Sequence, residues 1–250
     1  MKTKVFIPVV VVMFSLTGTF AQDATEIVKK ANDKMQGEIT SQSVMTMTIV
    51  RPTWERKISF KSWTKGRDYS LALITSPPKE QGQTFLKREN EMWSWNPTIN
   101  RLIKLPPSMM SQGWMGSDFS NDDLLKESSI VVDYTHKIIG DTTIEGRDCY
   151  KIELIPLENA AVVWGKILMN ISKKEYLEME NKYYDEDGYL VKTETASDIK
   201  VMDGRLIPAQ FELIPADKPG NKTIIKMDEI QFNKPIPDAF FSQQNMKRIR

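Results

Sequence analysis

The sequence turns on one stretch, Leu105-Pro-Pro-Ser-Met-Met-Ser-Gln-Gly-Trp-Met-Gly-Ser-Asp-Phe-Ser-Asn-Asp-Asp-Leu124. Between its terminal leucines it contains five large apolar side chains, Met109, Met110, Trp114, Met115 and Phe119, interspersed with prolines and glycines. Connecting segments are normally polar, because exposed apolar side chains gain nothing from water. A segment this rich in Met and Trp is therefore expected to bury its side chains against another part of the protein.

Two interpretations of this stretch follow from its composition. It is either a fixed loop that seals one end of a core or a movable lid over an apolar cavity. Met side chains are flexible and suit surfaces that accept variable apolar partners, which favours the lid. Within the stretch, Ser120-Asn-Asp-Asp123 is typical of a helix start, and Asp122 and Asp123 would complement the helix dipole. We therefore expect a mobile part at Ser108 to Met115, followed by a short covering helix.

The first 21 residues have the pattern of a cleaved secretory signal peptide. Lys2 and Lys4 are followed by an apolar run from Val5 to Leu16 and by the small-x-small site Thr19-Phe20-Ala21. The run is short for a bilayer span, so the mature form is expected to have no integral membrane span. The residue directly after the cleavage site is Gln22 and not Cys, so no lipid anchor is expected. The sequence predicts a periplasmic protein.

Residues 22–250 are predicted to form a single domain. No low-complexity tail, Gly/Ser linker or obvious repeat interrupts them, and their length is sufficient for one well-buried core. Cys149 is the only cysteine, so no intramolecular disulfide can support the fold. Acidic and basic residues nearly cancel, which argues against nucleic-acid binding.

The spacing of apolar residues predicts a mainly β protein of the α+β class. An amphipathic helix begins at Asp23-Ala-Thr-Glu26, a capping box, and ends at Gly37. After it come ten or more strands of period two, separated by turn residues, against two or three helices in total. Sheets of this size curl or close, and something apolar must fill the concave face.

Aromatic residues suggest where the concave face lies. Trp93 and Trp95 share one face of a strand that leads towards the Met-rich stretch, so we expect them to line the cavity beneath it. The full set of residues expected to line the cavity or to form the lid is Phe60, Phe85, Trp93, Trp95, Leu105, Met109, Met110, Trp114, Met115 and Phe119.

The sequence offers little for catalysis. His136 is the only histidine and lies in a predicted strand, where a structural role is more common than a catalytic one. Cys149 is also within a strand, which favours packing over nucleophilic chemistry. Asp185, Asp187 and Gly188 fit a hairpin turn better than a calcium loop. We expect no enzyme activity, no metal site and no cofactor.

The order of these elements resembles the LolA-like outer-membrane lipoprotein-sorting proteins, and more narrowly their branch found with RND-type exporters. The most specific match is Met115-Gly-Ser-Asp-Phe-Ser-Asn-Asp-Asp-Leu124. Supporting matches are residues 81–97, Arg101 to Pro106, Glu145 to Tyr150, Ile171 to Tyr176 and Tyr183 to Leu190. The resemblance covers essentially the whole mature chain.

The resemblance implies a strongly curved, unclosed half-barrel of about eleven antiparallel strands, whose concave apolar face is covered by helices and a lid. It implies that the protein carries acyl chains of a lipoprotein or another lipid across the periplasm towards the outer membrane. The implied partners are an inner-membrane exporter and an outer-membrane acceptor, and the carrier is expected to be a monomer. An arginine on an early strand holds the lid through backbone carbonyls in such carriers. Arg51 is the nearest candidate here, and Arg56 is the second.

Two other functions remain open on the sequence. A periplasmic sensor or accessory domain could use the same curved sheet to bind an exporter or a signalling protein. A hydrolase of lipid or envelope substrates is disfavoured, because no nucleophile–histidine pairing is evident. The sequence does not distinguish lipoprotein from phospholipid, hopanoid-like lipid or glycolipid cargo, since all present alkyl chains.

Overall fold

The computed structural model describes residues 23–36, 39–66, 68–89, 91–109, 112–121, 123, 130–160 and 162–250. The expected signal peptide and the helix-ending Gly37 lie outside these residues. In the described part of the chain, no helix is long and apolar enough to cross a membrane.

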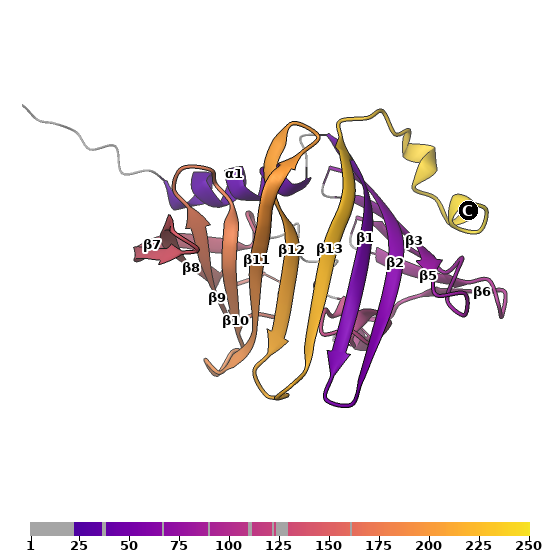
Figure 1. The fold of residues 1–250 in the computed structure, drawn as a ribbon, viewed down its shortest axis with the longest axis horizontal. Helices are drawn as coiled ribbons and strands as arrows, with labels where there is room; N and C mark the ends of the chain where they lie inside the picture. Colours follow the sequence, from indigo (N-terminus) through magenta and orange to yellow (C-terminus); the bar gives the residue numbers. More distant parts are fainter. Residues whose placement is uncertain are drawn as a thin grey trace, which may run out of the picture.

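One sheet of thirteen antiparallel strands dominates the structure (Figure 1). Helix α1 (Ala24–Gln36) precedes the sheet. The strands are β1 (Thr40–Arg51), β2 (Trp54–Lys65), β3 (Tyr69–Ser76), β4 (Thr84–Arg88), β5 (Glu91–Asn96), β6 (Arg101–Lys104), β7 (Tyr134–Ile144), β8 (Arg147–Pro156), β9 (Lys166–Ser172), β10 (Glu178–Tyr184), β11 (Leu190–Met202), β12 (Arg205–Pro215) and β13 (Lys222–Phe232). The short helix α3 (Gln243–Met246) lies near the C-terminus.

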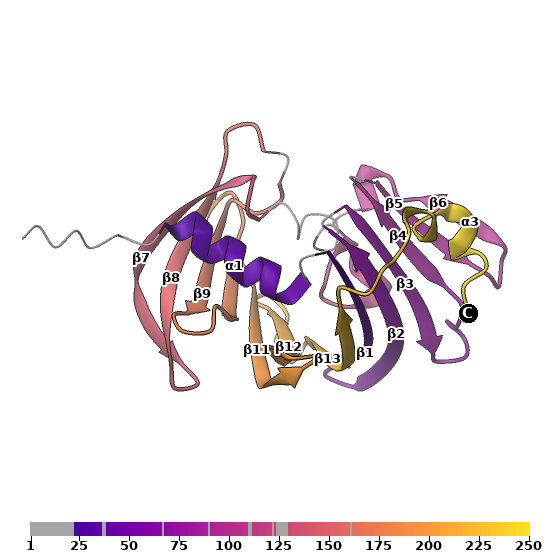
Figure 2. The same cartoon turned by 90° about the horizontal axis from the view of Figure 1, so that it is seen from above.

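The strands follow one another as a meander with a single exception at the centre. Their order is β6-β5-β4-β3-β2-β1-β13-β12-β11-β10-β9-β8-β7, so the first strand pairs with the last. The sheet therefore has two arms, β1–β6 and β7–β13, which meet where Met47 of β1 pairs with Ile225 of β13. The sheet is curved and open on one side, as Figure 2 shows. The predicted half-barrel is confirmed, with thirteen strands instead of about eleven.

Alternation along each strand gives the sheet an inner, concave face and an outer, convex face. The register places Met45 of β1, Phe60 of β2 and Ile74 of β3 side by side on the inner face. The inner face continues across the centre, because Met45 is also paired with Met227 of β13. Leu71 and Leu86 occupy the intervening positions of β3 and β4 and face outwards. Period-two sequences thus supply two different apolar surfaces from the same strands.

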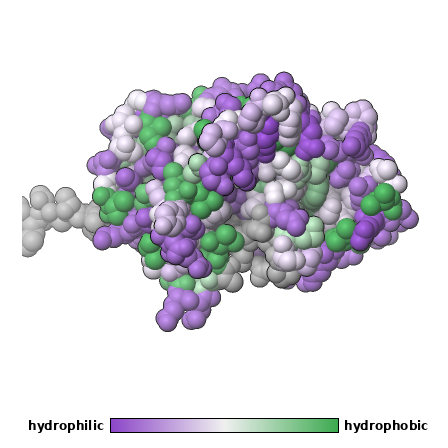
Figure 3. All heavy atoms as spheres, turned by 90° about the horizontal axis from the view of Figure 1, so that it is seen from below, coloured by the Kyte–Doolittle hydropathy of each residue, from purple (hydrophilic) through white to green (hydrophobic). Residues whose placement is uncertain are grey.

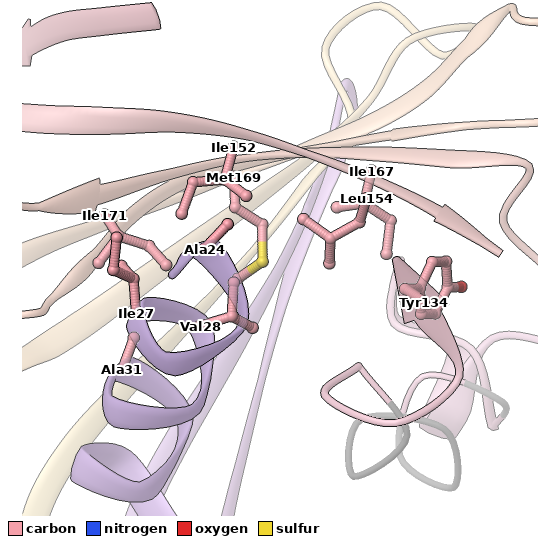
Figure 4. Packing of buried hydrophobic residues seen from close by; sticks show 10 residues of the cluster. All are labelled: Ala24, Ile27, Val28, Ala31, Tyr134, Ile152, Leu154, Ile167, Met169 and Ile171. Carbon is pink, nitrogen blue, oxygen red and sulfur yellow. The ribbon is translucent and has the colours of Figure 1, made fainter. Parts of the chain in front are cut away.

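Helix α1 covers the inner face of the β7–β9 arm. The Asp23 Oδ1 atom accepts a hydrogen bond of 2.9 Å from the Thr25 amide, so the predicted Asp cap is present. The buried side chains of the helix, Ala24, Ile27, Val28 and Ala31, point towards aliphatic residues of the sheet (Figure 4). The sheet partners are Ile152, Leu154, Ile167, Met169 and Ile171.

The C-terminal tail, residues 233–250, covers part of the outer face of the other arm. Phe241 is fully buried and lies in a cluster with Leu71, Leu86 and Trp95. Phe240 contacts Phe241 and Trp63 edge to face. These two Phe residues therefore lie on the outer face of β2–β5.

Two stretches of the sheet differ from the pattern that the sequence predicts. Gly140 and Asp141 were expected to form a turn, but they lie within β7 at an irregularity between Ile138 and Gly140. The segments Leu190–Ala196 and Ile199–Met202 are one strand, β11, in which Asp198 has a φ of 52°. Local irregularities of this kind let a strand bend without ending.

The exterior of the protein is mixed in polarity. Viewed from below, hydrophobic residues occur in small groups between hydrophilic ones (Figure 3).

Candidate functional site

The segment between β6 and β7 must bridge the open side of the sheet. Strands β6 and β7 form opposite edges of the sheet, so the chain from residue 105 to residue 133 has to cross from one arm to the other. We call its described residues 105–109, 112–121 and 123 the crossover segment. The Met-rich stretch therefore lies over the inner face because of the strand order.

Within the crossover segment, residues 112–121 form a compact loop. The Trp114 amide donates to the Phe119 carbonyl at 2.6 Å, and the Asn121 amide donates to the Gln112 carbonyl at 2.9 Å. A Cβ atom at Gly113 would lie 2.3 Å from the Ser117 carbonyl oxygen, so a glycine is required there. Met115 has a φ of 55°, a left-handed conformation that is uncommon for a residue with a flexible side chain.

Trp114 is the part of this loop that enters the protein. Its side chain is 3 % exposed and makes edge-to-face contacts with Phe60 and Phe85, at ring-centroid distances of 5.3 and 5.4 Å. Met109 and Met115 pack against the same cluster. The Trp114 Nε1 atom is buried and has no hydrogen-bond partner among the described residues. A buried N–H without an acceptor opposes this closed position.

Two arginines of the sheet hold the loop by its backbone. Arg51 Nη2 donates to the Gly116 carbonyl at 3.1 Å, and Arg56 Nη2 donates to the Met115 carbonyl. Arg51 Nη1 also donates to Asp118 Oδ2 at 3.0 Å, in an ion pair whose side chains are 13 % and 6 % exposed. Thr223 Oγ1 donates to the same Asp118 oxygen at 2.7 Å. The resemblance to the LolA-like proteins implied Arg51 first and Arg56 second as lid-holding residues. Both donate to carbonyls of this loop, and their role in holding a lid stays a prediction.

A cavity of about 350 Å³ lies between the crossover segment, α1 and the inner face. This volume is within the usual range for small-molecule sites. Its apolar wall comes mainly from β1–β5 and β13, with Trp114 and Phe119 on the side of the crossover segment. The apolar lining residues of the sheet are Met45, Phe60, Ala72, Phe85, Met92, Ile225, Met227 and Ile230.

The wall formed by β10 and β11 is polar and charged. Lys192 of β11 is 5 % exposed and forms an ion pair of 2.5 Å with Asp123 of the crossover segment. The Lys192 ammonium also lies 4.6 Å from the ring centroid of Trp164 and 4.7 Å from that of Tyr183. All four residues line the cavity. The cavity therefore has an apolar side and a side with a buried cation.

A reciprocal pair of hydrogen bonds fixes the end of the crossover segment that carries Asp123. The Ser120 amide donates to Asp123 Oδ2 at 2.7 Å, and the Asp123 amide donates to Ser120 Oγ at 3.1 Å. This is the pattern of a helix N-terminus, which the sequence predicted at Ser120. Asp122 and the residues after Asp123 lie outside the described residues, so the covering helix stays a prediction.

The structure brings most of the predicted cavity residues together. Phe60, Phe85, Trp114 and Phe119 line the cavity. Leu105, Met109 and Met115 belong to the apolar cluster around Trp114. Met110 lies outside the described residues. Their contact with a lipid stays a prediction.

Trp93 and Trp95 do not line the cavity, and their predicted position was wrong. Met92 faces the cavity, so strand alternation turns both tryptophans to the outer face. There they join the cluster under the C-terminal tail, and Trp95 is 7 % exposed. Their proximity to the Met-rich stretch in sequence was misleading, because one residue of register separates the two faces.

Sequence reasoning missed Lys192 and Asp123. Lys192 is within a predicted strand, and only its phase relative to Glu194, which also lines the cavity, could have placed it inwards. Asp123 was assigned to helix capping alone. The pairing could not be found from the sequence, because it joins two segments that are distant along the chain.

The remaining candidate chemical groups have structural surroundings. His136 Nδ1 is 3.2 Å from Thr25 Oγ1 of α1, and Nε2 is 3.0 Å from the Ile130 carbonyl. Burial raises the pKa of the Cys149 thiol, which packs against Leu177 and Met179. Among the described residues, no group of three or more His, Cys, Asp and Glu side chains is arranged to hold a metal ion.

The chain was compared with protein-family models and with curated proteins. A family model described as "Uncharacterized protein" matches residues 66–248. A comparison with curated proteins found no match.

Several solved structures share the fold over almost their full length. A DUF1329 family protein from Desulfovibrio piger has a TM-score of 0.80 and 23% sequence identity, covering 90% of this chain and 99% of the other. A putative outer membrane lipoprotein-sorting protein domain from Vibrio parahaemolyticus has a TM-score of 0.78 and 21% identity, covering 90% and 98%. A LolA superfamily protein from Nitrosomonas europaea has a TM-score of 0.76 and 22% identity, covering 90% and 99%.

Proposed function

Because the chain belongs to the family whose model matches residues 66–248 and has the LolA-like fold, we propose that it is a carrier of alkyl chains. It binds the acyl chains of a lipoprotein or a lipid in the cavity of about 350 Å³ and releases them to an acceptor. The observation that carries this proposal is the position of Trp114, which occupies apolar space that an alkyl chain could take.

The physical need for such a cavity is large. Each buried methylene is worth about 0.8 kcal/mol, so a chain of about sixteen carbons gains about 12 kcal/mol when it leaves water. A lipid with that penalty cannot cross an aqueous compartment at a useful rate without a carrier. Flexible Met side chains on the cavity wall, such as Met45, Met92 and Met227, suit alkyl chains of differing shape.

The crossover segment acts as the lid in this proposal. Without cargo, Trp114 packs between Phe60 and Phe85 and keeps water from the apolar wall. The buried Nε1 atom and the left-handed backbone at Met115 both disfavour the closed form, so the arginine contacts are needed to hold it. Cargo takes the place of the Trp114 ring, and the loop moves outwards. The mechanism is binding and transfer, without a covalent step.

The N-terminal pattern supports a periplasmic location, and two neighbours of the fold carry LolA or lipoprotein-sorting names. An inner-membrane exporter would then supply the cargo, and an outer-membrane acceptor would receive it. Transfer would depend on a higher affinity at each successive partner.

Two measurements test the proposal. Native mass spectrometry of the protein purified from its own envelope is expected to show a bound lipid or acyl chain. In solution, the purified protein is expected to bind Nile red, a neutral apolar dye, and to release the dye when a saturating concentration of an alkyl ligand is added. A protein that carries no lipid and takes up no dye would contradict the carrier function.

A pair of matched variants locates the binding. Ala72 lies on the cavity wall, so Ala72→Trp fills the cavity and is expected to abolish dye uptake. Lys61 is exposed on the outer face of the adjacent strand β2, so Lys61→Trp adds the same side chain outside the cavity and leaves uptake unchanged. Equal uptake by folded Ala72→Trp and Lys61→Trp would place the dye elsewhere.

A further inference from the structure

The buried cation of the cavity wall points to a head-group preference, an inference that rests on the proposed carrier function. Lys192 is enclosed by the rings of Trp164 and Tyr183 and by one carboxylate, Asp123. It projects from the sheet, whereas Asp123 belongs to the crossover segment. The ion pair therefore joins the wall of the cavity to its cover.

Opening the crossover segment would separate this pair. Once Asp123 moves outwards, Lys192 stays in the wall, with an exposed fraction of only 5 % in the closed form. A buried cation without an anion is strongly unfavourable, so the open form needs a replacement for the carboxylate. A negatively charged group on the cargo supplies one.

The other acidic side chains that line this part of the cavity have different partners. Glu194 Oε2 accepts a hydrogen bond of 3.2 Å from the Tyr183 hydroxyl, and Glu178 Oε2 accepts one of 3.1 Å from Asn181 Nδ2. Lys87, 8 % exposed, lines the same cavity from the other arm. Among the described residues, Lys192 forms its ion pair with Asp123 and not with Glu194 or Glu178.

We propose that the cargo is an amphiphile with an anionic head group, a carboxylate or a phosphate, which displaces Asp123 from Lys192. The alkyl chain lies along the apolar wall under β1–β5, and the head group lies against Lys192. The Lys192–Asp123 pair is then a latch: a neutral lipid must break it without compensation, and an anionic lipid replaces it. Head-group charge thereby controls whether the crossover segment opens.

The test compares ligands of one chain length by displacement of Nile red. Wild-type protein is expected to bind hexadecyl phosphate and palmitate at least about tenfold more tightly than hexadecanol, as a charge-assisted hydrogen bond provides. Inorganic phosphate alone is expected to displace no dye, because it lacks the chain. If hexadecanol or hexadecyltrimethylammonium binds as tightly as the anionic ligands, the head-group assignment is wrong.

Variants at the two ends of the latch separate its parts. Lys192→Met is expected to reduce the anionic preference to below about twofold and to tighten hexadecanol binding, because no ion pair then has to break when the crossover segment opens. Asp123→Asn is expected to raise the affinity for both palmitate and hexadecanol and to keep the anionic preference, since neither ligand has to break the ion pair and Lys192 still favours the anion. Lys200→Met, on the same strand but 41 % exposed at its side chain, is the control and should behave as wild type.

The outcomes distinguish this inference from the carrier function itself. A folded Lys192→Met protein that keeps the anionic preference overturns the latch but leaves the carrier intact. If Lys192→Met does not fold, Lys192→Gln provides the same comparison with a polar side chain. A wild-type protein that binds none of the four ligands overturns both proposals.

Discussion

The two arms of the sheet bury their inner faces in opposite ways. The β7–β9 arm packs against α1 through aliphatic side chains such as Ile27, Val28 and Ile152, all fully buried. The β1–β5 arm is covered by a loop that inserts one ring, Trp114, and is held by arginine side chains at its backbone carbonyls. The first contact is apolar, extensive and regular, and the second is polar, local and strained. This difference fits the proposal that α1 is a permanent part of the core and that the crossover segment is a cover that can move away.

The largest expected effect tests whether α1 is fixed on the β7–β9 arm. Ile152 is fully buried between the sheet and the helix, so Ile152→Ala should lower the free energy of unfolding by about 3–4 kcal/mol. Urea denaturation measures this change. Ile139→Ala, on the neighbouring strand and 42 % exposed, should cost less than about 0.5 kcal/mol. Equal costs for the two variants would mean that α1 is not fixed on this arm.

The second effect concerns the arginine that holds the crossover segment. Arg51→Met leaves the carboxylate of Asp118, 6 % exposed, without its cation, and should lower the free energy of unfolding by about 2–3 kcal/mol. It should also speed amide hydrogen exchange at Gly116 and Ser117, while exchange in α1 stays slow. Lys57→Met on β2, whose side chain is 67 % exposed, is the control. Slow exchange in folded Arg51→Met would show that the loop does not depend on this contact.

The third effect is the loss of stability on removing the Trp114 ring, which should be smaller than the size of this side chain suggests. Replacement of a buried Trp by Ala usually costs about 3–5 kcal/mol, but Trp114→Ala should cost only about 1–2 kcal/mol. The new space joins an existing cavity, and the variant removes a buried N–H without an acceptor. Nile red affinity should rise, because the dye no longer has to expel the ring. A cost of 4 kcal/mol with unchanged dye affinity would identify Trp114 as ordinary core.

The smallest effect concerns the reactivity of the buried Cys149 thiol in β8. Burial raises the pKa of the Cys149 thiol above its ordinary value of 9.0, so less thiolate is present in the folded protein than in the unfolded protein at any given pH. Iodoacetamide should therefore react slowly with the folded protein and rapidly in urea, as followed by mass spectrometry. The contribution of this thiol to the free energy of unfolding is fully present below pH 9, where the unfolded chain is also protonated, and it is lost as the pH rises above that value. Rapid alkylation of the native protein at pH 8 would contradict the burial.

The sequence was informative about local structure and poor at pairing distant residues. Period-two patterns located most strands, and the order of elements indicated the half-barrel. It was harder to predict which face of the sheet a side chain occupies, because Trp93 and Met92 differ by one position yet lie on opposite sides of the sheet. Such an assignment needs the register, which bulges such as the one at Val44 and Met45 change locally.

The candidate site shows the same limit. The composition of the Met-rich stretch predicted that it packs over apolar residues, and its placement near Phe60 and Phe85 agrees with that expectation. The two arginines were found only through the resemblance to a family. The Lys192–Asp123 pair depends on how the crossover segment lies across the sheet, and no local pattern contains that information.

The pairing of the first strand with the last also determines when the sheet can be completed. A chain is made from its N-terminus, so β1 can pair with β2 as soon as residue 65 is available. The other edge of β1 stays unpaired until β13 has been synthesised, because Ser41 pairs with Phe232. Until then the inner wall is divided into two halves with exposed apolar margins. The wall of the cavity is therefore incomplete until nearly the whole chain has been synthesised.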